Sequence, residues 1–291
     1  MLVTGATGLL GGATVEELLC SGKYEVHCLV REGSPNASRL ESLPVGVFRG
    51  DVGDEKDLRR ALSGMDALVH VAGIEYTPAV LRAMRRAGVD RLVLVGSTSV
   101  HSRYEFRSGM RRTMEELVRG SGLRWTIVRP AMIYGSELDK NIHRLLRFLD
   151  RSPIFPMFGS GENLWQPVYY EDCARGVFEA LKRPVTIEKS YDLPGAEPLT
   201  YRDLVRTAAA ALDRKPRIVA IPLEPARRTL QLAETMRLSL PIKSEQVMRL
   251  REDKAYSYDR ASRDLGYSPR AFSEGVGLEV ARLREIGLLK P

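Results

Sequence analysis

The sequence predicts an α/β protein built on a doubly wound parallel sheet. Short segments rich in Val, Ile and Leu alternate with amphipathic helical patterns through the first half of the chain. The strand segments are apolar almost throughout, which is typical of strands that helices cover on both faces. After Gly135 the alternation gives way to sequence rich in proline and glycine. We therefore expect a second, smaller and mainly helical C-terminal lobe that binds the substrate.

The individual elements follow from β-branched runs and from helical periodicity, taken in order along the chain. Strands are expected at residues 2–4, 25–30, 45–49, 67–71, 91–96 and 125–129. Helices are expected between them at residues 12–21, 55–62, 79–87 and 110–119. Further helices are expected at residues 172–181 and 201–212, on either side of a short extended piece at 190–193. In folds of this class, ligands bind at the carboxyl ends of the strands.

The length of 291 residues suits one large domain or two interleaved ones. We expect residues 1–135 to form the first domain and residues 136–291 to form the substrate-binding lobe. The segment 166–183 is expected to return to the first domain.

The composition excludes several classes of protein. The net charge of +7 comes from basic residues scattered among acidic ones, whereas a nucleic-acid-binding face needs a concentrated patch. The three cysteines have no metal-binding or disulfide spacing, which favours a reducing compartment and no metal. No apolar run approaches the roughly 18–20 residues of a membrane span, and no targeting segment is evident. We therefore expect a cytoplasmic protein that binds neither nucleic acid nor membrane.

A glycine-rich turn is the strongest local motif. The opening T-G-A-T-G-L-L-G places Gly5, Gly8 and Gly11 between the first strand and the first helix. Glycine lets the backbone turn tightly there and approach a pyrophosphate at the positive end of the helix. This pattern predicts a Rossmann-type dinucleotide-binding turn, and a tight turn without a ligand is the alternative.

Residues at the end of the second strand bear on the choice of dinucleotide. Arg31 can pair with a ribose 2′-phosphate through its planar guanidinium, whereas Glu32 can accept hydrogen bonds from a free 2′-hydroxyl. Because Arg31 comes first, we expect NADP(H), with NAD(H) as the alternative. Asp51 and Val52 are expected to border the adenine, and Ala72 and Gly73 let the cofactor pass close to the backbone.

These residues together resemble the short-chain dehydrogenase/reductase superfamily, in its extended or atypical branch. That branch includes proteins similar to NAD(P)-dependent epimerases and dehydratases and to accessory subunits of complex I. The motifs that carry the resemblance are the turn at residues 4–11, Gly50-Asp51-Val52, His70-Val71-Ala72-Gly73, Val95-Gly96-Ser97-Thr98-Ser99-Val100, Arg129-Pro130 with Tyr134-Gly135, Gln166-Pro167-Val168 with Asp172, and Asp259-Arg260-Ala261 leading to Leu265-Gly266-Tyr267-Ser268-Pro269. Residues expected to contact the cofactor are Gly5, Thr7, Gly8, Leu9, Leu10, Gly11, Arg31, Asp51, Val52, Ala72, Gly73, Ser97, Pro130, Met132 and Ile133.

The resemblance also implies catalytic roles, and here the chain departs from the pattern. In such enzymes a Tyr transfers the proton and a Lys four residues later lowers the pKa of that Tyr. A Ser or Thr after the fifth strand binds the substrate oxygen, which implies this role for Ser97, with Thr98 or Ser99 as substitutes. The Tyr-x-x-x-Lys pair is missing, because Arg107 and Arg111 stand at the corresponding positions.

Two interpretations of the missing pair remain open. Tyr104 acts as the acid, with Arg107 or Arg111 as a permanently charged partner, or the site binds the cofactor without turnover. Trp165 and Gln166 stand where nucleotide-sugar epimerases usually carry an arginine for the substrate diphosphate. That exchange favours an apolar substrate, and Trp165 is expected to contact it.

The leading hypothesis is an NADP(H)-dependent oxidoreductase of a small, largely apolar carbonyl compound or alcohol. A non-catalytic NAD(P)(H)-binding sensor or assembly protein is the first alternative, and an NAD-dependent sugar epimerase or dehydratase is the second. The expected partner is a small-molecule substrate, with the chain acting as a monomer or homodimer.

Overall fold

The chain forms two compact units, each described here by itself. The computed structural model describes residues 1–222 and 252–290. The first unit comprises Met1–Ile133, Val168–Pro194 and Ser257–Pro269, and the second comprises Tyr134–Pro167, Gly195–Tyr256 and Arg270–Pro291. Residues 184–194 and 257–269 therefore belong to the first unit, whereas the sequence pattern assigned them to the second lobe.

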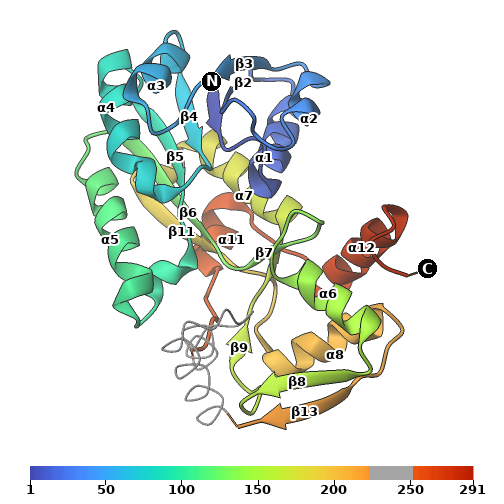
Figure 1. Cartoon of the computed structure of the whole chain (residues 1–291). Coiled ribbons are helices and arrows are strands. Elements are labelled where there is room, and N and C mark those ends of the chain that lie inside the picture. Colours follow the sequence, from blue (N-terminus) through green and yellow to red (C-terminus); the bar gives the residue numbers. More distant parts are fainter. Residues whose placement is uncertain (223–251, 291) are drawn as a thin grey trace, which may run out of the picture. The chain divides into compact units, whose positions relative to one another are not determined.

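A parallel sheet of seven strands forms the centre of the first unit (Figure 1). Its strands, in spatial order, are β11 (Lys189–Leu193), β6 (Arg124–Pro130), β5 (Arg91–Val95), β4 (Ala67–His70), β1 (Leu2–Thr4), β2 (His27–Val30) and β3 (Gly46–Arg49). The helices of this unit are α1 (Leu9–Cys20), α2 (Ser38–Glu41), α3 (Glu55–Leu62), α4 (Thr77–Ala87), α5 (Glu105–Arg119), α7 (Tyr170–Lys182) and α11 (Asp259–Leu265). Single turns of 3₁₀ helix lie at η1 (Ile74–Tyr76), η2 (Thr98–His101) and η3 (Pro184–Thr186). This architecture confirms the predicted doubly wound α/β fold.

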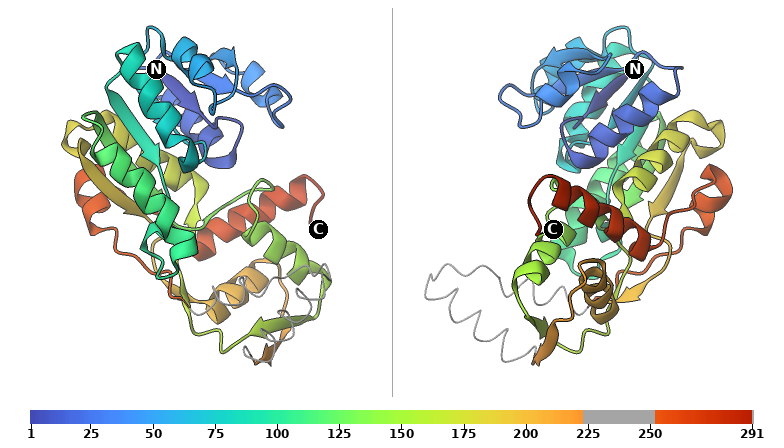
Figure 2. Two further views of the ribbon diagram at one scale, coloured as in Figure 1. Left: turned by 60° about the vertical axis from the view of Figure 1, so that its left-hand side comes forward. Right: turned by 90° about the vertical axis from the view of Figure 1, so that its right-hand side faces the viewer.

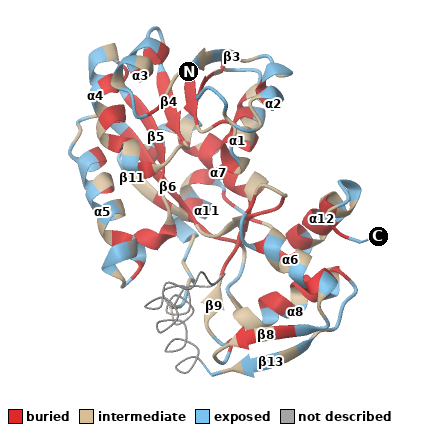
Figure 3. Cartoon of the chain, in the orientation of Figure 1, coloured by how far each residue is buried: buried red, intermediate tan, exposed pale blue. Residues whose placement is uncertain are grey.

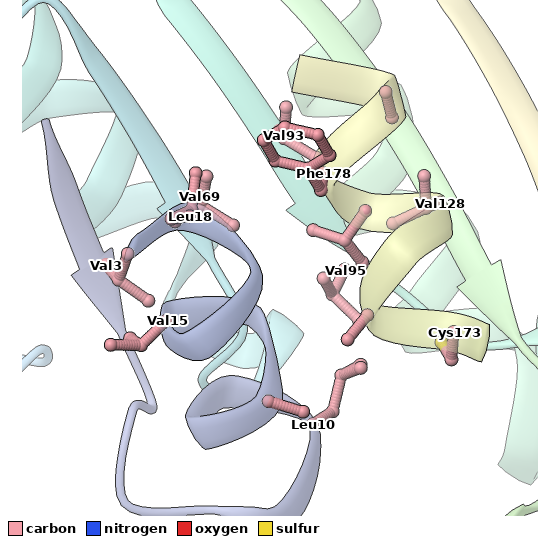
Figure 4. Close-up of a cluster of buried hydrophobic side chains, with 14 of the residues drawn as sticks. Val3, Leu10, Val15, Leu18, Val69, Val93, Val95, Val128, Cys173 and Phe178 are labelled. Carbon is pink, nitrogen blue, oxygen red and sulfur yellow. The ribbon is translucent and has the colours of Figure 1, made fainter. Parts of the chain in front are cut away.

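The alternation of side chains along the strands produces two cores, one on each face of the sheet. Val3 and Val69 point toward α1 and α7, whereas their neighbours Leu2 and Leu68 point toward α3 and α4. Figure 4 shows the first of these cores, in which Leu10 and Leu18 of α1 lie close to side chains of α7. Helices α1 and α7 run side by side over that face (Figure 2). The central strands are buried on both faces, which explains their unbroken apolar sequence (Figure 3).

The strand order identifies where a ligand would bind. The chain passes from β1 outward through β2 and β3, and then crosses to the other side of β1 to form β4. The order of the strands thus reverses between β1 and β4. In open α/β sheets, the crevice at the carboxyl ends of the strands on either side of this point is the usual ligand site.

The second unit combines helices with short strand pairs. Its described elements are α6 (Ile142–Arg151), β8 (Ile154–Phe158), β9 (Leu164–Trp165), β12 (Leu199–Thr200), α8 (Tyr201–Ala211), β13 (Arg217–Ile221) and α12 (Phe272–Glu285). Strand β8 pairs in parallel with β13, and β9 pairs antiparallel with β12. Strand β7 (Ile133–Tyr134), which begins at the last residue of the first segment of the first unit, pairs with β10 (Val168–Tyr169) of that unit. Among the described residues, no helix has the length and apolarity that a membrane crossing needs.

A buried carboxyl group lies within the second unit. Glu279 on α12 is fully shielded from solvent, and the nearly buried carboxylate of Asp139 lies beside it. Burial disfavours the charged form, and together with the like charge of Asp139 it raises the pKa of Glu279 to about 10. Glu279 is therefore protonated in the folded protein at neutral pH.

Replacing Glu279 by Gln should stabilise the protein increasingly as pH rises. The folded-state pKa is raised, so the cost of keeping this group protonated grows from pH 4.5 up to its folded pKa of about 10. By linkage, Glu279→Gln should increase the free energy of unfolding by about 3 kcal/mol at pH 7 and by under about 1 kcal/mol at pH 5. Urea denaturation at the two pH values measures this. The exposed Glu285→Gln on the same helix is the control, and an equal gain at both pH values would contradict the assignment.

Candidate functional site

A pocket of about 420 Å³ lies at the carboxyl ends of the central strands in the first unit. Three loops that follow β1, β4 and β5 form most of it, and α5 and the end of β6 complete it. The residues that line it are Gly5, Gly8, Leu9, Leu10, Gly11, Val71, Ala72, Gly73, Ile74, Glu75, Val95, Gly96, Ser97, Arg111, Pro130, Ala131 and Ile133. The pocket therefore lies at the point where the strand order reverses.

Two glycines in the first turn are required by close backbone packing. Gly5 has a φ of 76°, and a Cβ atom there would lie 2.7 Å from the backbone nitrogen of Ala72. At Gly11 a Cβ atom would collide with the carbonyl oxygen of Gly5. The absence of both side chains brings the turn after β1, the first turn of α1 and the turn after β4 together around the pocket.

The first turn of α1 presents a positive helix end to the pocket. Gly8 occupies the N-cap position, where no side chain caps the helix, and the first turn carries no acidic residue. The unsatisfied amide groups and the helix dipole favour an anion at such a position. The residues present therefore fit the pyrophosphate of a dinucleotide.

A buried histidine anchors the turn after β4. His70 Nδ1 lies 2.7 Å from Thr4 Oγ1, and His70 Nε2 lies 3.2 Å from the carbonyl oxygen of Gly73. The carbonyl can only accept, so Nε2 carries the proton and the Thr4 hydroxyl donates to Nδ1. Burial lowers the pKa of His70 to about 4, which keeps the ring neutral. This residue links β4 to β1 without adding charge next to the pocket.

Some of the predicted cofactor contacts lie outside the residues that line the pocket. Arg31 is exposed directly after β2, and it forms no ion pair with any described residue. Asp51 follows β3, and its Oδ1 accepts a hydrogen bond of 2.7 Å from the amide of Gly53. Thr7 Oγ1 lies 3.0 Å from Ser34 Oγ. The contacts proposed for these residues, and for Val52 beside them, stay predictions.

Ser97 lines the pocket, whereas its two hydroxyl neighbours do not. The Ser97 Oγ accepts hydrogen bonds from the amide of Ser99 at 3.2 Å and from the Ser99 hydroxyl at 3.0 Å. Thr98 is buried, and its hydroxyl donates to the carbonyl of Pro130 at 3.4 Å. Of the hydroxyl groups considered as substrate ligands, Ser97 is the one at the pocket wall.

The structure brings Ser97 and Arg111 to one pocket and places Tyr104 elsewhere. Arg111 on α5 is among the lining residues, and Tyr104 is not. The Tyr104 ring stacks on Phe106 with the ring centroids 5.7 Å apart, and the guanidinium of Arg103 lies 5.3 Å from its centroid. The side chain of Arg107 lies outside the described part of the structure.

A buried ionic network that the sequence did not predict flanks the pocket. Arg129 donates to Glu115 through Nε at 2.8 Å and through Nη2 at 2.6 Å. Arg129 also lies 3.4 Å from Asp192, which in turn contacts His101 at 3.0 Å. Burial lowers the pKa of Arg129, but Glu115 and Asp192 outweigh this and raise it. Gly96 leaves room for the network, because a Cβ atom there would lie 3.3 Å from Glu115 Oε1.

Two other predicted residues have different surroundings. Trp165 belongs to the second unit, where Lys254 Nζ lies 3.3 Å from the centroid of its ring and the Tyr201 ring lies 5.4 Å away. Its indole nitrogen is buried and has no hydrogen-bond partner among the described residues. Met132 is half-buried and does not line the pocket, although its neighbours Pro130 and Ile133 do.

The fold and the pocket together define a Rossmann-type protein with a site that fits a dinucleotide. Residues 5–146 match the family model described as NAD(P)H-binding. The chain thus carries a domain similar to this NAD(P)H-binding family over nearly half of its length.

Curated relatives include reductases and a subunit of a respiratory complex. The ceramide reductase of Caulobacter vibrioides is 29% identical over 76% of this chain and 73% of its own length. The 2-alkyl-3-oxoalkanoate reductase of Stenotrophomonas maltophilia is 26% identical over 95% of this chain and 97% of its own length. A mitochondrial NADH dehydrogenase [ubiquinone] 1 alpha subcomplex subunit 9 of Arabidopsis thaliana is 26% identical over 88% of this chain and 69% of its length. An uncharacterized protein of Mycobacterium tuberculosis is 29% identical over 80% of this chain, which spans only 25% of that relative.

Solved structures share the fold along nearly the whole chain. The crystal structure of gox2253 superposes with a TM-score of 0.82 at 24% identity and covers 99% of both chains. A UDP-glucuronic acid 4-epimerase from Bacillus cereus, in complex with NAD, superposes with a TM-score of 0.77 at 19% identity and covers 98% of both chains. At these identities the likeness extends to the fold alone.

Proposed function

We propose that the protein is an NADP(H)-dependent oxidoreductase that acts on a small, largely apolar carbonyl compound or alcohol. The observation that carries the proposal is that one pocket combines the glycine turn, the Ser97 hydroxyl and the Arg111 guanidinium. The turn fits a pyrophosphate, and the other two groups fit an oxygen that gains negative charge.

In the proposed reaction, side chains of this protein bind and polarise the substrate oxygen. When bound, the cofactor supplies or accepts the hydride. The Ser97 hydroxyl donates a hydrogen bond to the carbonyl oxygen, and Arg111 contributes a positive charge. Tyr104 stays the proposed proton donor, and this role requires its ring to leave Phe106 and Arg103.

Trp165 and Gln166 stand where nucleotide-sugar epimerases usually bind the substrate diphosphate, and these two residues favour an apolar substrate. Gln166 is almost fully buried, and its amide is already engaged with the Gly195 carbonyl and the Tyr256 amide, each at 2.8 Å. These bonds and its burial leave Gln166 with at most one neutral N–H donor, in place of the charged fork of an arginine. Two relatives named as reductases, of ceramide and of a 2-alkyl-3-oxoalkanoate, favour a substrate that carries alkyl groups.

Replacing Ser97 by Ala should lower carbonyl reduction without weakening cofactor binding. Loss of one hydrogen bond to a developing oxyanion costs about 10²–10³-fold in kcat. Absorbance at 340 nm across a panel of alkyl ketones and aldehydes measures turnover, and calorimetry measures the Kd for NADPH. Tyr104→Phe should also slow turnover if Tyr104 supplies the proton. Unchanged turnover in Ser97→Ala would contradict the role given to that residue.

Replacing Arg31 by Ala should reduce the preference for NADPH. A guanidinium that pairs with the 2′-phosphate contributes charged hydrogen bonds, so its loss should weaken NADPH binding about 10–100-fold. Binding of NADH, which lacks this phosphate, should change less than about twofold. Calorimetric titration of both coenzymes checks this, with Arg39→Ala as a control of the same charge. Equal weakening for both coenzymes would show that Arg31 does not read the phosphate.

A cofactor-binding protein without turnover is the second candidate function. The observation that favours it is that the described residues lining the pocket include neither a tyrosine nor a lysine. Under this function, NADPH binds but no compound in the carbonyl panel is reduced. The double replacement of Ser97 and Tyr104 then leaves the biological phenotype intact, and loss of the phenotype would exclude this candidate.

A further inference from the structure

We propose that the second unit carries a separate binding site for an amphiphilic oxyanion, meaning a phosphate or carboxylate joined to an alkyl chain. A pocket of about 660 Å³ lies between α8 and the segment that leads into β13. Four of its lining residues are cationic, namely Arg202, Arg206, Arg214 and Lys215. Asp213 is the one acidic residue among the described residues that line it.

The local fold explains why these cations face one pocket. Arg202, Arg206 and Ala210 recur every four residues, so they lie on one stripe of α8. After α8 the chain turns at Asp213, whose φ is 57°, and then runs into β13. This turn brings Arg214 and Lys215 back beside the helical stripe.

Two of the four cations have little or no pairing with acidic side chains of the described residues, so their charge is available to a ligand. Arg202 lies 3.5 Å from Glu162, and Arg214 lies 3.2 Å from the buried Asp150. Among the described residues, Arg206 forms its one ion pair with the exposed Asp203 at 3.6 Å, and exposed pairs of this kind are weak.

Lys215 forms no ion pair with any described residue. The carboxylate of Asp213 lies 4.0 Å from the guanidinium of Arg284, which is not among the residues that line the pocket. Arg206 and Lys215 are therefore the groups that would hold an oxyanion.

Apart from Asp213, the rest of the pocket wall is apolar. This wall determines the chemistry of the second part of the ligand. Ala209, Ala210, Pro216 and Ile218 line it. The volume falls within the range of roughly 300–1,000 Å³ that is typical of small-molecule sites. An inorganic anion would leave this apolar wall in contact with water, whereas an alkyl chain would cover it. All lining residues belong to the second unit, so the proposal does not depend on the oxidoreductase function.

Calorimetric titration of the full chain with octyl phosphate and with inorganic phosphate tests the proposal. We expect octyl phosphate to bind at least about tenfold more tightly, because burial of the alkyl chain adds to the charge pairing. The double variant R206E/K215E should weaken this binding at least about tenfold. R144E reverses one charge at an exposed position of α6, outside the pocket, and should leave binding unchanged. NADPH titration and circular dichroism show that each variant is folded.

A second arm distinguishes a free ligand from a lipid headgroup. Vesicles of phosphatidylcholine with and without phosphatidylglycerol are sedimented with the wild type, R206E/K215E and R144E. Octyl phosphate binding that is lost only in R206E/K215E supports a soluble ligand, and vesicle binding with the same loss supports a lipid source of the same chemistry. If the charge reversal disturbs folding, the milder double variant R206M/K215M replaces R206E/K215E in both experiments. Octyl phosphate binding that all variants share, or no binding of either probe by the wild type, would overturn the proposal.

Discussion

A Gly11→Val variant should lose dinucleotide binding. Any Cβ atom at this position would collide with the carbonyl oxygen of Gly5, which is a backbone atom held in the turn after β1. Relief of the collision must push the first turn of α1 away from that turn, and the amide groups that face a pyrophosphate move with it. We expect affinity for NADPH to fall by more than about 100-fold, with a destabilisation of about 1–3 kcal/mol from overpacking.

Calorimetry on the folded variant measures this loss, with circular dichroism as the check on folding. Gly277→Ala is the matched control, because Gly277 also lies in a helix but a Cβ atom there meets no atom within 4 Å. That control should bind NADPH normally and gain about 0.5–1 kcal/mol from the higher helix propensity of alanine. Normal NADPH binding by Gly11→Val would remove the glycine turn from the cofactor site.

Replacing Glu115 by Ala should cause the largest loss of stability among the residues around the pocket. Glu115 is 1% exposed and neutralises the nearly buried Arg129, and it also accepts a hydrogen bond of 2.9 Å from Arg119. Removal of one partner leaves a buried charge poorly compensated, which costs about 3–5 kcal/mol. For a chain of this size, that corresponds to a fall in Tm of roughly 5–8 °C.

Thermal unfolding followed by circular dichroism measures the effect. Glu116→Ala, at the exposed neighbouring position, should change Tm by less than about 2 °C. The double variant E115M/R129M removes both charges and should regain most of the lost stability, as uncharged replacements of buried ion pairs often do. A small change in Glu115→Ala, or no recovery in the double variant, would show that the pair is not what stabilises this region.

The sheet of the first unit was predictable because its strands are buried on both faces. All six predicted strands lie within two residues of β1 to β6, and the predicted helix 55–62 coincides with α3. Helix α5 was expected from residue 110 but begins at Glu105, since Gly109 and the polar residues before it interrupt the apolar pattern. The strand pairs and α12 of the second unit were missed. Strands β9 and β12 have only two residues each, Pro156 interrupts the pattern of β8, and the glycines at 275 and 277 interrupt that of α12.

The glycine turn was the most predictable part of the candidate site, and the ionic network was the least. Gly5, Gly8 and Gly11 could be predicted from spacing and context, and all three line the pocket. Glu115 reads in the sequence as one of two adjacent charges on a helix surface. Its burial depends on Arg129, fourteen residues away on β6, and such a pairing exists only once the sheet is formed. The lining residue Glu75 was also missed.

The most direct test of the account is calorimetric titration of the purified chain with NADPH and with NADH. We expect a heat of binding with both coenzymes, and an affinity for NADPH at least about tenfold higher than that for NADH. Absence of binding heat with either coenzyme, in a sample shown to be folded, would contradict the dinucleotide site itself. Binding of NADH in preference to NADPH would contradict the role given to Arg31.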